Sequence, residues 1–226
     1  MAFALILPSS RDAIRASGGD AAKPAEADAA ASQLRRDYER LTRWWLGFAA
    51  FFMATIGAFV AIGTANEMVR LGGPVATVDL LVVVLAGLIS LAGIAILVML
   101  WRSGRVVLDA AVWWLRLPYR QGWRQRNAAG WVGARTVHYE LRVFVRITTA
   151  TLATLIGIGG VSLFVRDLLN GLEIMSFSAL AIGLIGLASG FGQFGGVFRL
   201  TSGMSEADPL WVRIRSAFAS SKSPEA

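Results

Sequence analysis

The chain has 226 residues, of which 55% are hydrophobic and 16% are charged, whereas soluble domains carry about 25% charged residues. This balance excludes an ordinary soluble domain and predicts an all-α integral membrane protein. The absence of cysteine excludes disulfides and Cys-ligated metal sites, and the net charge of +7 comes almost entirely from arginine. A composition rich in Ala, Gly and Arg favours a bacterial source.

Residues 1–31 are predicted to form a flexible cytoplasmic tail. The apolar start MAFALILP lacks the basic region of a signal peptide, and residues 9–31 show no apolar period. A helix is expected to begin near Ser32 and to run straight into the first span, so that residues 32–101 hold this lead-in helix and a first transmembrane hairpin. Its apolar face recurs at helical spacing, through Leu34, Tyr38, Leu41 and Trp45.

Four apolar stretches are each long enough to cross a hydrocarbon core of about 30 Å as a helix. They cover residues 45–65, 80–101, 147–165 and 174–198. None has a formal charge in its interior, and within lipid a helix is the economical way to pair every backbone group. We therefore expect four transmembrane helices in two hairpins, the second over residues 147–198.

The two hairpins resemble each other weakly. Ile56-Gly57 opens an apolar run that reaches GLISLAG at Gly87, and Ile156-Gly157 opens one that reaches GLIGLASG at Gly183. Both a duplication in parallel orientation and chance similarity between low-complexity sequences stay open.

The positions of the basic residues predict the orientation in the membrane. Of the 22 Lys and Arg residues, all but Arg70 and Arg166 lie before the first span, between the second and third, or after the fourth. All eight tryptophans lie in or beside the same segments. Because positive residues concentrate on the cytoplasmic side, we expect a multi-pass protein of the cytoplasmic membrane with both termini inside.

Residues 102–146 are expected to form a Trp/Arg-rich interfacial segment, with an amphipathic helix over 105–117 that Pro118 ends. Residues 199–226 are expected to form a second cytoplasmic amphipathic segment. Trp and Arg together suit the surface of an anionic leaflet. The predicted interface residues are Arg105, Trp113, Trp114, Arg116, Arg120, Trp123 and Trp211. In the alternative, residues 80–117 form one projecting helix whose tryptophans pack on a partner.

No catalytic, cofactor-binding or metal-binding residues are expected, since ionisable groups are missing at depth and His138 stands alone. Small residues at four-residue spacing favour close helix packing. The predicted packing residues are Gly186, Gly190, Gly192 and Gly196. Gln193, within the same stretch, is the candidate pore residue.

These observations favour a non-catalytic accessory or scaffold subunit of a larger assembly, bound through the Gly-rich helix faces and the basic, aromatic segments. The alternative is an oligomeric channel or small-solute carrier that uses the fourth span. The expected partners are anionic membrane lipids and other membrane subunits, or a second copy of the chain. Nucleic acid is not an expected partner, because membrane insertion already accounts for the basic residues.

Overall fold

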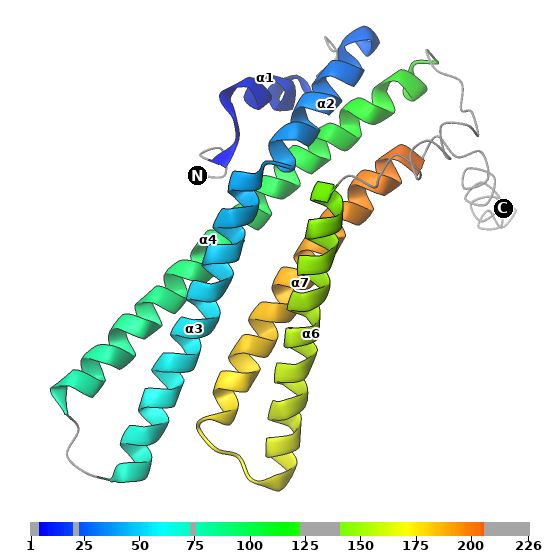
Figure 1. Ribbon diagram of the computed structural model, residues 1–226. Coiled ribbons are helices and arrows are strands. Elements are labelled where there is room, and N and C mark those ends of the chain that lie inside the picture. Colours follow the sequence, from blue (N-terminus) through cyan, green and yellow to red (C-terminus); the bar gives the residue numbers. More distant parts are fainter. Residues whose placement is uncertain (1–4, 20–22, 73–75, 123–140, 206–226) are drawn as a thin grey trace, which may run out of the picture. The chain divides into compact units, whose positions relative to one another are not determined.

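A computed structural model describes residues 5–19, 23–72, 76–122 and 141–205, and every element within these ranges is helical (Figure 1). The elements are α1 (Pro8–Ala16), a short 3₁₀ helix η2 (Pro24–Glu26), α2 (Ala27–Tyr38), α3 (Leu41–Leu71), α4 (Thr77–Arg120), α6 (Leu141–Asn170) and α7 (Ser176–Ser205). The all-α prediction is confirmed for this part of the chain.

Four helical segments are long and apolar enough to cross a membrane: Pro24–Leu71, Thr77–Pro118, Phe144–Asn170 and Ser176–Gly196. Within the most apolar window of each, only 17% to 28% of the residues are buried inside the protein. Most apolar side chains on these helices therefore face outward, as those of lipid-exposed helices do.

The described residues divide into two compact units. The first unit holds residues 40–72, 76–102 and 145–194, and contains α3, the first part of α4, and most of α6 and α7. The second unit holds residues 5–19, 23–39, 103–122, 141–144 and 195–205, and contains α1, α2 and the last part of α4.

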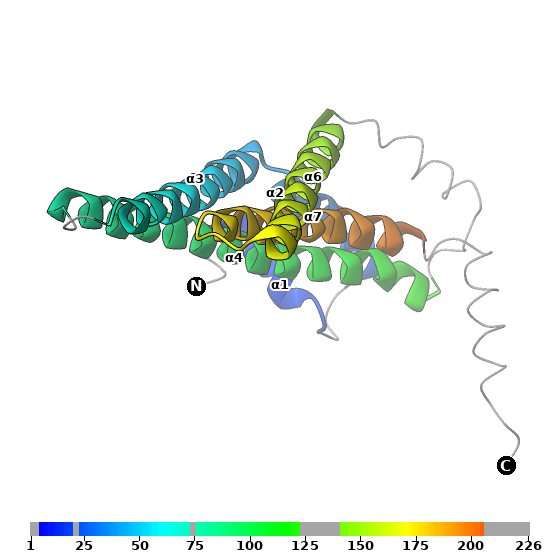
Figure 2. The same cartoon turned by 90° about the horizontal axis from the view of Figure 1, so that it is seen from below.

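Within the first unit, α3 and α4 touch backbone to backbone (Figure 1 and Figure 2). A Cβ atom at Gly57 would lie 2.7 Å from the carbonyl oxygen of Ala86 and 2.8 Å from the backbone nitrogen of Ser90. One at Gly93 would lie 2.6 Å from the backbone nitrogen of Ala54. The Ser90 hydroxyl donates a hydrogen bond to the Ala54 carbonyl at 2.8 Å. Only glycine leaves room for this approach at positions 57 and 93.

The α6–α7 pair packs in the same way. A Cβ atom at Gly157 would lie 2.5 Å from the backbone nitrogen of Leu187 and 3.0 Å from the carbonyl oxygen of Gly183. One at Gly190 would lie 3.1 Å from the backbone nitrogen of Thr154 and still closer to its hydroxyl oxygen. Two glycines on opposite helices again set the separation of the pair.

The contacts of the two pairs correspond position by position. Adding 100 to residue numbers in α3 and 97 to those in α4 converts the backbone contacts at Gly57 and Gly93 into those at Gly157 and Gly190. The sequence comparison aligned Gly87 with Gly183, but the packing equivalent of Gly183 is Ala86, and Gly87 has no neighbour within 4 Å. The shared contact register favours duplication over chance similarity and corrects the sequence alignment by one residue.

The N-terminal prediction is wrong in two respects. Residues expected to be flexible form α1, η2 and the first turn of α2, so helical structure starts at Pro8 and not near Ser32. The lead-in helix is also interrupted, because Arg40 has an extended backbone (φ −57°, ψ 132°) between α2 and α3. The reason for the first error is tertiary: Ile6, Ala27 and Ala31 of this segment are buried in the core of the second unit.

The end of the predicted 105–117 helix also differs. These residues continue α4 without a break, and the helix passes Pro118 to end at Arg120. A proline deprives a helix of one N–H donor and crowds the carbonyl four residues earlier. Pro118 lies in the last turn of α4, so only two helical residues follow the missing hydrogen bond.

Gly93→Ala tests whether the close backbone contact limits stability. Replacing helical glycine by alanine ordinarily stabilises a helix by about 1 kcal/mol. At position 93 overpacking should dominate and lower the free energy of unfolding by about 1–3 kcal/mol. Gly87→Ala, on the same helix with open space around it, is the matched control and should be neutral or stabilising. Denaturant titration of the full chain in detergent measures both, and equal effects would contradict the proposed role of Gly93.

Candidate functional site

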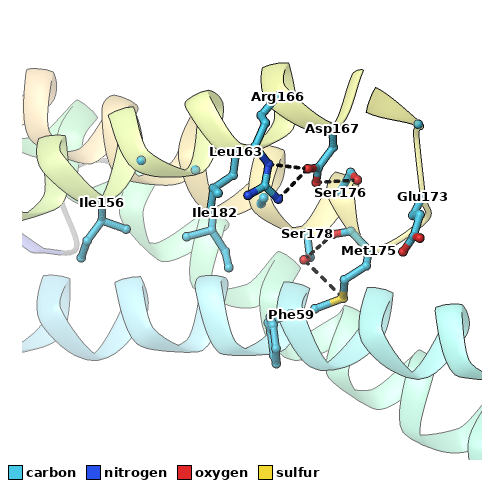
Figure 3. Close-up of a pocket in the computed structure, with 14 residues that line it drawn as sticks. Phe59, Ile156, Leu163, Arg166, Asp167, Glu173, Met175, Ser176, Ser178 and Ile182 are labelled. Atoms are coloured by element: carbon cyan, nitrogen blue, oxygen red, sulfur yellow. Dashed lines mark hydrogen bonds and ion pairs between the residues drawn. The ribbon is translucent and has the colours of Figure 1, made fainter. Parts of the chain in front are cut away.

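A groove of about 670 Å³ lies in the first unit, formed mainly by α6 and α7 with Phe59 of α3 on its wall (Figure 3). Its volume falls in the range of small-molecule sites, about 300–1,000 Å³. Apolar side chains form the floor, and polar groups lie at the end near the α6–α7 connection.

The floor follows one face of α6. Ile156, Gly159, Gly160 and Leu163 line it at helical spacing, and Ile182 joins them from α7. A Cβ atom at Gly159 would meet nothing within 4 Å, whereas one at Gly160 would lie 2.5 Å from the Ala179 carbonyl oxygen. Gly160 therefore packs the helix pair together, while Gly159 leaves the groove open.

Charged and hydroxyl groups form the polar rim. Arg166 donates from Nε and Nη2 to Oδ1 of Asp167, at 3.0 and 2.8 Å. The Ser176 hydroxyl donates to the other carboxylate oxygen, Oδ2, at 2.9 Å. The Arg166 side chain is 66% exposed and that of Asp167 25%, and Glu173 beside them is exposed. The rim thus presents fixed charges of both signs to an apolar groove.

Gln193, the candidate pore residue, is half-buried in α7. The Thr149 hydroxyl lies 3.3 Å from the Gln193 Oε1 atom and 2.9 Å from the carbonyl oxygen of Val145. The indole nitrogen of Trp44 lies 3.5 Å from the same hydroxyl. The Thr149 hydroxyl of α6 is therefore in polar contact with side chains of both α3 and α7.

The four predicted packing glycines all face helices of this chain. A Cβ atom at Gly186 would lie 2.7 Å from the carbonyl oxygen of Ala153, and Gly190 lies against Thr154. A Cβ atom at Gly192 would lie 3.3 Å from the ring of Trp101. In the second unit, Gly196 approaches the hydroxyl of Tyr38. Intramolecular contacts therefore occupy the positions at which the glycine spacing would also suit a partner helix.

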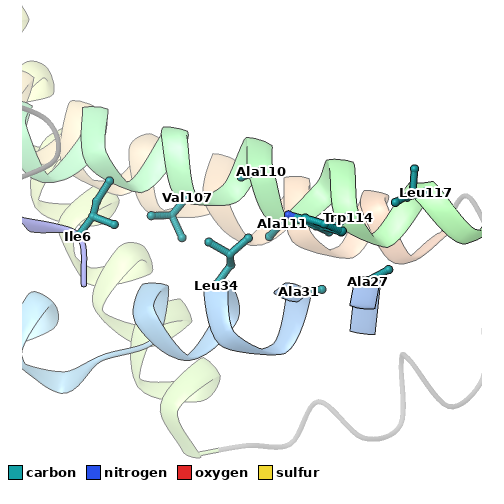
Figure 4. Close-up of a cluster of buried hydrophobic side chains, with 9 residues drawn as sticks. All are labelled: Ile6, Ala27, Ala31, Leu34, Val107, Ala110, Ala111, Trp114 and Leu117. Atoms are coloured by element: carbon teal, nitrogen blue, oxygen red, sulfur yellow. The ribbon is translucent and has the colours of Figure 1, made fainter. Parts of the chain in front are cut away.

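Trp114, one of the predicted interface residues, is buried in the core of the second unit (Figure 4). It is only 2% exposed, and its indole N–H donates to the Ala13 carbonyl at 2.8 Å. Its ring lies between α4 and α2, beside Ala27 and Ala31. Trp113 packs edge-on against it, with ring centroids 5.1 Å apart. Trp114 is therefore buried by the chain's own N-terminal segment.

The other predicted interface residues have different surroundings. Arg105 and Arg120 are exposed on α4, whereas Arg116 is half-buried. Trp123, Trp211 and His138 lie outside the described residues. The structure thus does not bring these residues into one described site.

Sequence reasoning missed both the groove and the N-terminal core. The signal for the groove was an apolar stripe on α6 that includes an unpacked glycine and ends at Arg166 and Asp167. From the sequence alone, that stripe cannot be distinguished from an ordinary lipid-facing surface. Only the structure shows that Phe59 and α7 form the other walls of the groove. Within the described residues there is no cluster of three His, Cys, Asp or Glu side chains that could hold a metal ion.

Comparison of the chain with protein-family models, with curated proteins and with solved structures returns no match.

Trp114→Ala should loosen the N-terminal helices from α4. The substitution removes a buried ring and the hydrogen bond to Ala13, and Trp→Ala in a core costs about 3–5 kcal/mol. Hydrogen exchange in the full chain should show faster exchange over 8–16 and 27–38. Trp113→Ala, at a partly buried neighbour, should have a smaller effect. Unchanged exchange in the Trp114 variant would contradict its assignment as the centre of this core.

Proposed function

We propose that this chain is a non-catalytic accessory or scaffold subunit of a larger assembly in the bacterial cytoplasmic membrane. Its four apolar helices form two transmembrane hairpins, and both ends lie in the cytoplasm. The observation that carries the proposal is that hydroxyl groups within the spans bond to the helix backbone.

Hydroxyl groups inside the apolar segments bond to helix backbone. The side chains of Thr55, Thr151 and Thr154 donate to carbonyls four residues earlier, at 2.8–2.9 Å, and Ser90 donates across to α3. Serine and threonine hydroxyls in helices commonly form such hydrogen bonds to backbone carbonyls. Membrane enzymes and ion-coupled carriers usually place ionisable groups at depth, whereas residues 45–65, 80–101 and 147–165 contain none.

Backbone contact inside each helix pair also argues against a solute path between its two helices. The glycine contacts leave no room for even one additional methyl group at positions 57, 93, 157 and 183 without a shift. Two closed pairs with extensive apolar exteriors suit lateral association with lipid and other membrane helices.

The proposed orientation can be tested with single cysteines, because the sequence contains none. Cysteine at Leu71 or Leu169, which are 80% and 81% exposed, should react with a membrane-impermeant maleimide on intact cells. Cysteine at exposed Arg120 should react only after the membrane is opened. Labelling of the Arg120 variant in intact cells, with the other two protected, would reverse the orientation.

The subunit proposal predicts a stoichiometric membrane partner or a defined self-assembly. Native mass spectrometry after mild extraction from the source membrane should detect a complex of constant composition. Mild cross-linking before extraction is the control for loss of weakly bound partners. A lone monomer both with and without cross-linking would contradict the proposal.

The second candidate, an oligomeric channel or small-solute carrier, has one specific observation in its favour. Gln193 and Thr149 place a polar contact between the side chains of α6 and α7. A flux across protein-loaded liposomes that Gln193→Leu abolishes, with helicity unchanged, would favour this function. Absence of flux in both proteins would favour the scaffold.

A further inference from the structure

We propose that the groove on α6 and α7 binds one phospholipid whose headgroup carries a phosphate and a primary ammonium. One acyl chain would lie along the α6 floor, with the headgroup at the polar rim. The inference requires only that α6 and α7 span a bilayer, and it goes beyond the proposed function because it depends on neither a protein partner nor the orientation.

The length of the groove matches one leaflet. From Ile156 to Asp167 the floor and rim together cover eleven residue steps of α6, or about 16 Å at about 1.5 Å per residue. Half of a hydrocarbon core of about 30 Å is about 15 Å. A lipid chain reaching from the rim to the membrane centre would therefore contact the whole floor.

The apolar surfaces of the groove are available to such a chain. Phe59, Ile156 and Leu163 are 48%, 46% and 47% exposed, although they face a concave surface. Covering them with an acyl chain maintains the dispersion contacts that these side chains would otherwise make with mobile lipid. The apolar floor alone would accept any acyl chain, so the rim must supply the selectivity.

The rim is complementary to a zwitterion. Arg166 uses Nε and Nη2 for Asp167, and no described residue accepts a hydrogen bond from its Nη1 atom. A guanidinium has five N–H donors, so donors remain for a phosphate oxygen. The exposed carboxylate of Glu173 pairs with no basic side chain among the described residues and can accept from an ammonium. With one cation and two carboxylates, the rim disfavours a headgroup that is only anionic.

The internal repeat identifies the position that opens the groove. In the contact register of the two pairs, Gly159 of α6 corresponds to Phe59 of α3. The first pair thus carries a large ring where the second carries a hydrogen atom, and that ring forms a wall of the same groove. Gly159→Phe would place in α6 the residue that α3 already has there, at a position where an added Cβ atom meets nothing within 4 Å.

The test titrates the full chain in detergent with phosphatidylethanolamine, phosphatidylcholine and phosphatidylglycerol of identical acyl chains, and counts bound lipids by native mass spectrometry. Phosphatidylcholine keeps the phosphate and the positive charge but has no N–H donor. We expect one phosphatidylethanolamine per chain, bound about tenfold more tightly than either other lipid, a difference of about 1.4 kcal/mol.

Three variants locate the site. Gly159→Phe should weaken phosphatidylethanolamine binding at least about tenfold, whereas the matched Gly87→Phe on α4, which also has open space, should bind like the wild type. Glu173→Gln, at an exposed position, should reduce the preference for phosphatidylethanolamine over phosphatidylcholine. Equal binding of the three lipids, a preference for phosphatidylglycerol, or equal losses in the two phenylalanine variants would each overturn the proposal.

Discussion

Direct backbone contact at paired glycines is the constraint on which the first unit depends. Inside a bilayer, burying apolar surface between helices gains little, since lipid tails are as apolar as the side chains they replace. Association then relies on close packing, and packing is closest where no side chain separates the helices. Gly57 with Gly93, and Gly157 with Gly190, supply that approach at two levels of each pair. The hydroxyl bond from Ser90 to Ala54 becomes feasible at the same separation.

The second unit is held together by a core of buried apolar side chains. Its core contains Leu34, Val107 and Trp114, which are at most 2% exposed, together with alanines that let α2 lie close to α4. The Trp114 ring is part of this core, and its indole N–H donates to the Ala13 carbonyl. Asp37 is also fully buried, and it accepts a hydrogen bond from the Leu7 backbone at 3.0 Å. The segment before α1 is thereby attached to the end of α2.

The groove follows from an asymmetry between two otherwise corresponding helix pairs. Both pairs use one face for the glycine contacts, and this leaves another face of α6 to be shaped by its remaining residues. Because position 159 is glycine where α3 has phenylalanine, the α6 surface is hollow at that level. Arg166 and Asp167 correspond to Asn66 and Glu67 of α3 in the same register. The second pair thus differs from the first both in the groove and at its charged rim.

The sequence by itself determined the four long apolar helices, because length and uninterrupted hydropathy leave few other ways to satisfy a backbone in lipid. It also identified glycine faces suited to close packing. It did not determine which helices those glycines contact, since spacing on one helix does not specify its neighbour. Nor did it locate the floor of the groove, which is an ordinary apolar stripe until α3 and α7 lie beside it.

The Trp/Arg-rich segment, residues 102–146, shows most clearly what the sequence alone could not predict. A large ring beside arginines is equally suited to a membrane surface and to a protein core with a polar edge, because both bury the ring and leave charge in water. Only the tertiary structure decided between them for Trp114. Its hydrogen-bond partner, Ala13, is 101 residues away, and no local pattern encodes a contact between such distant segments.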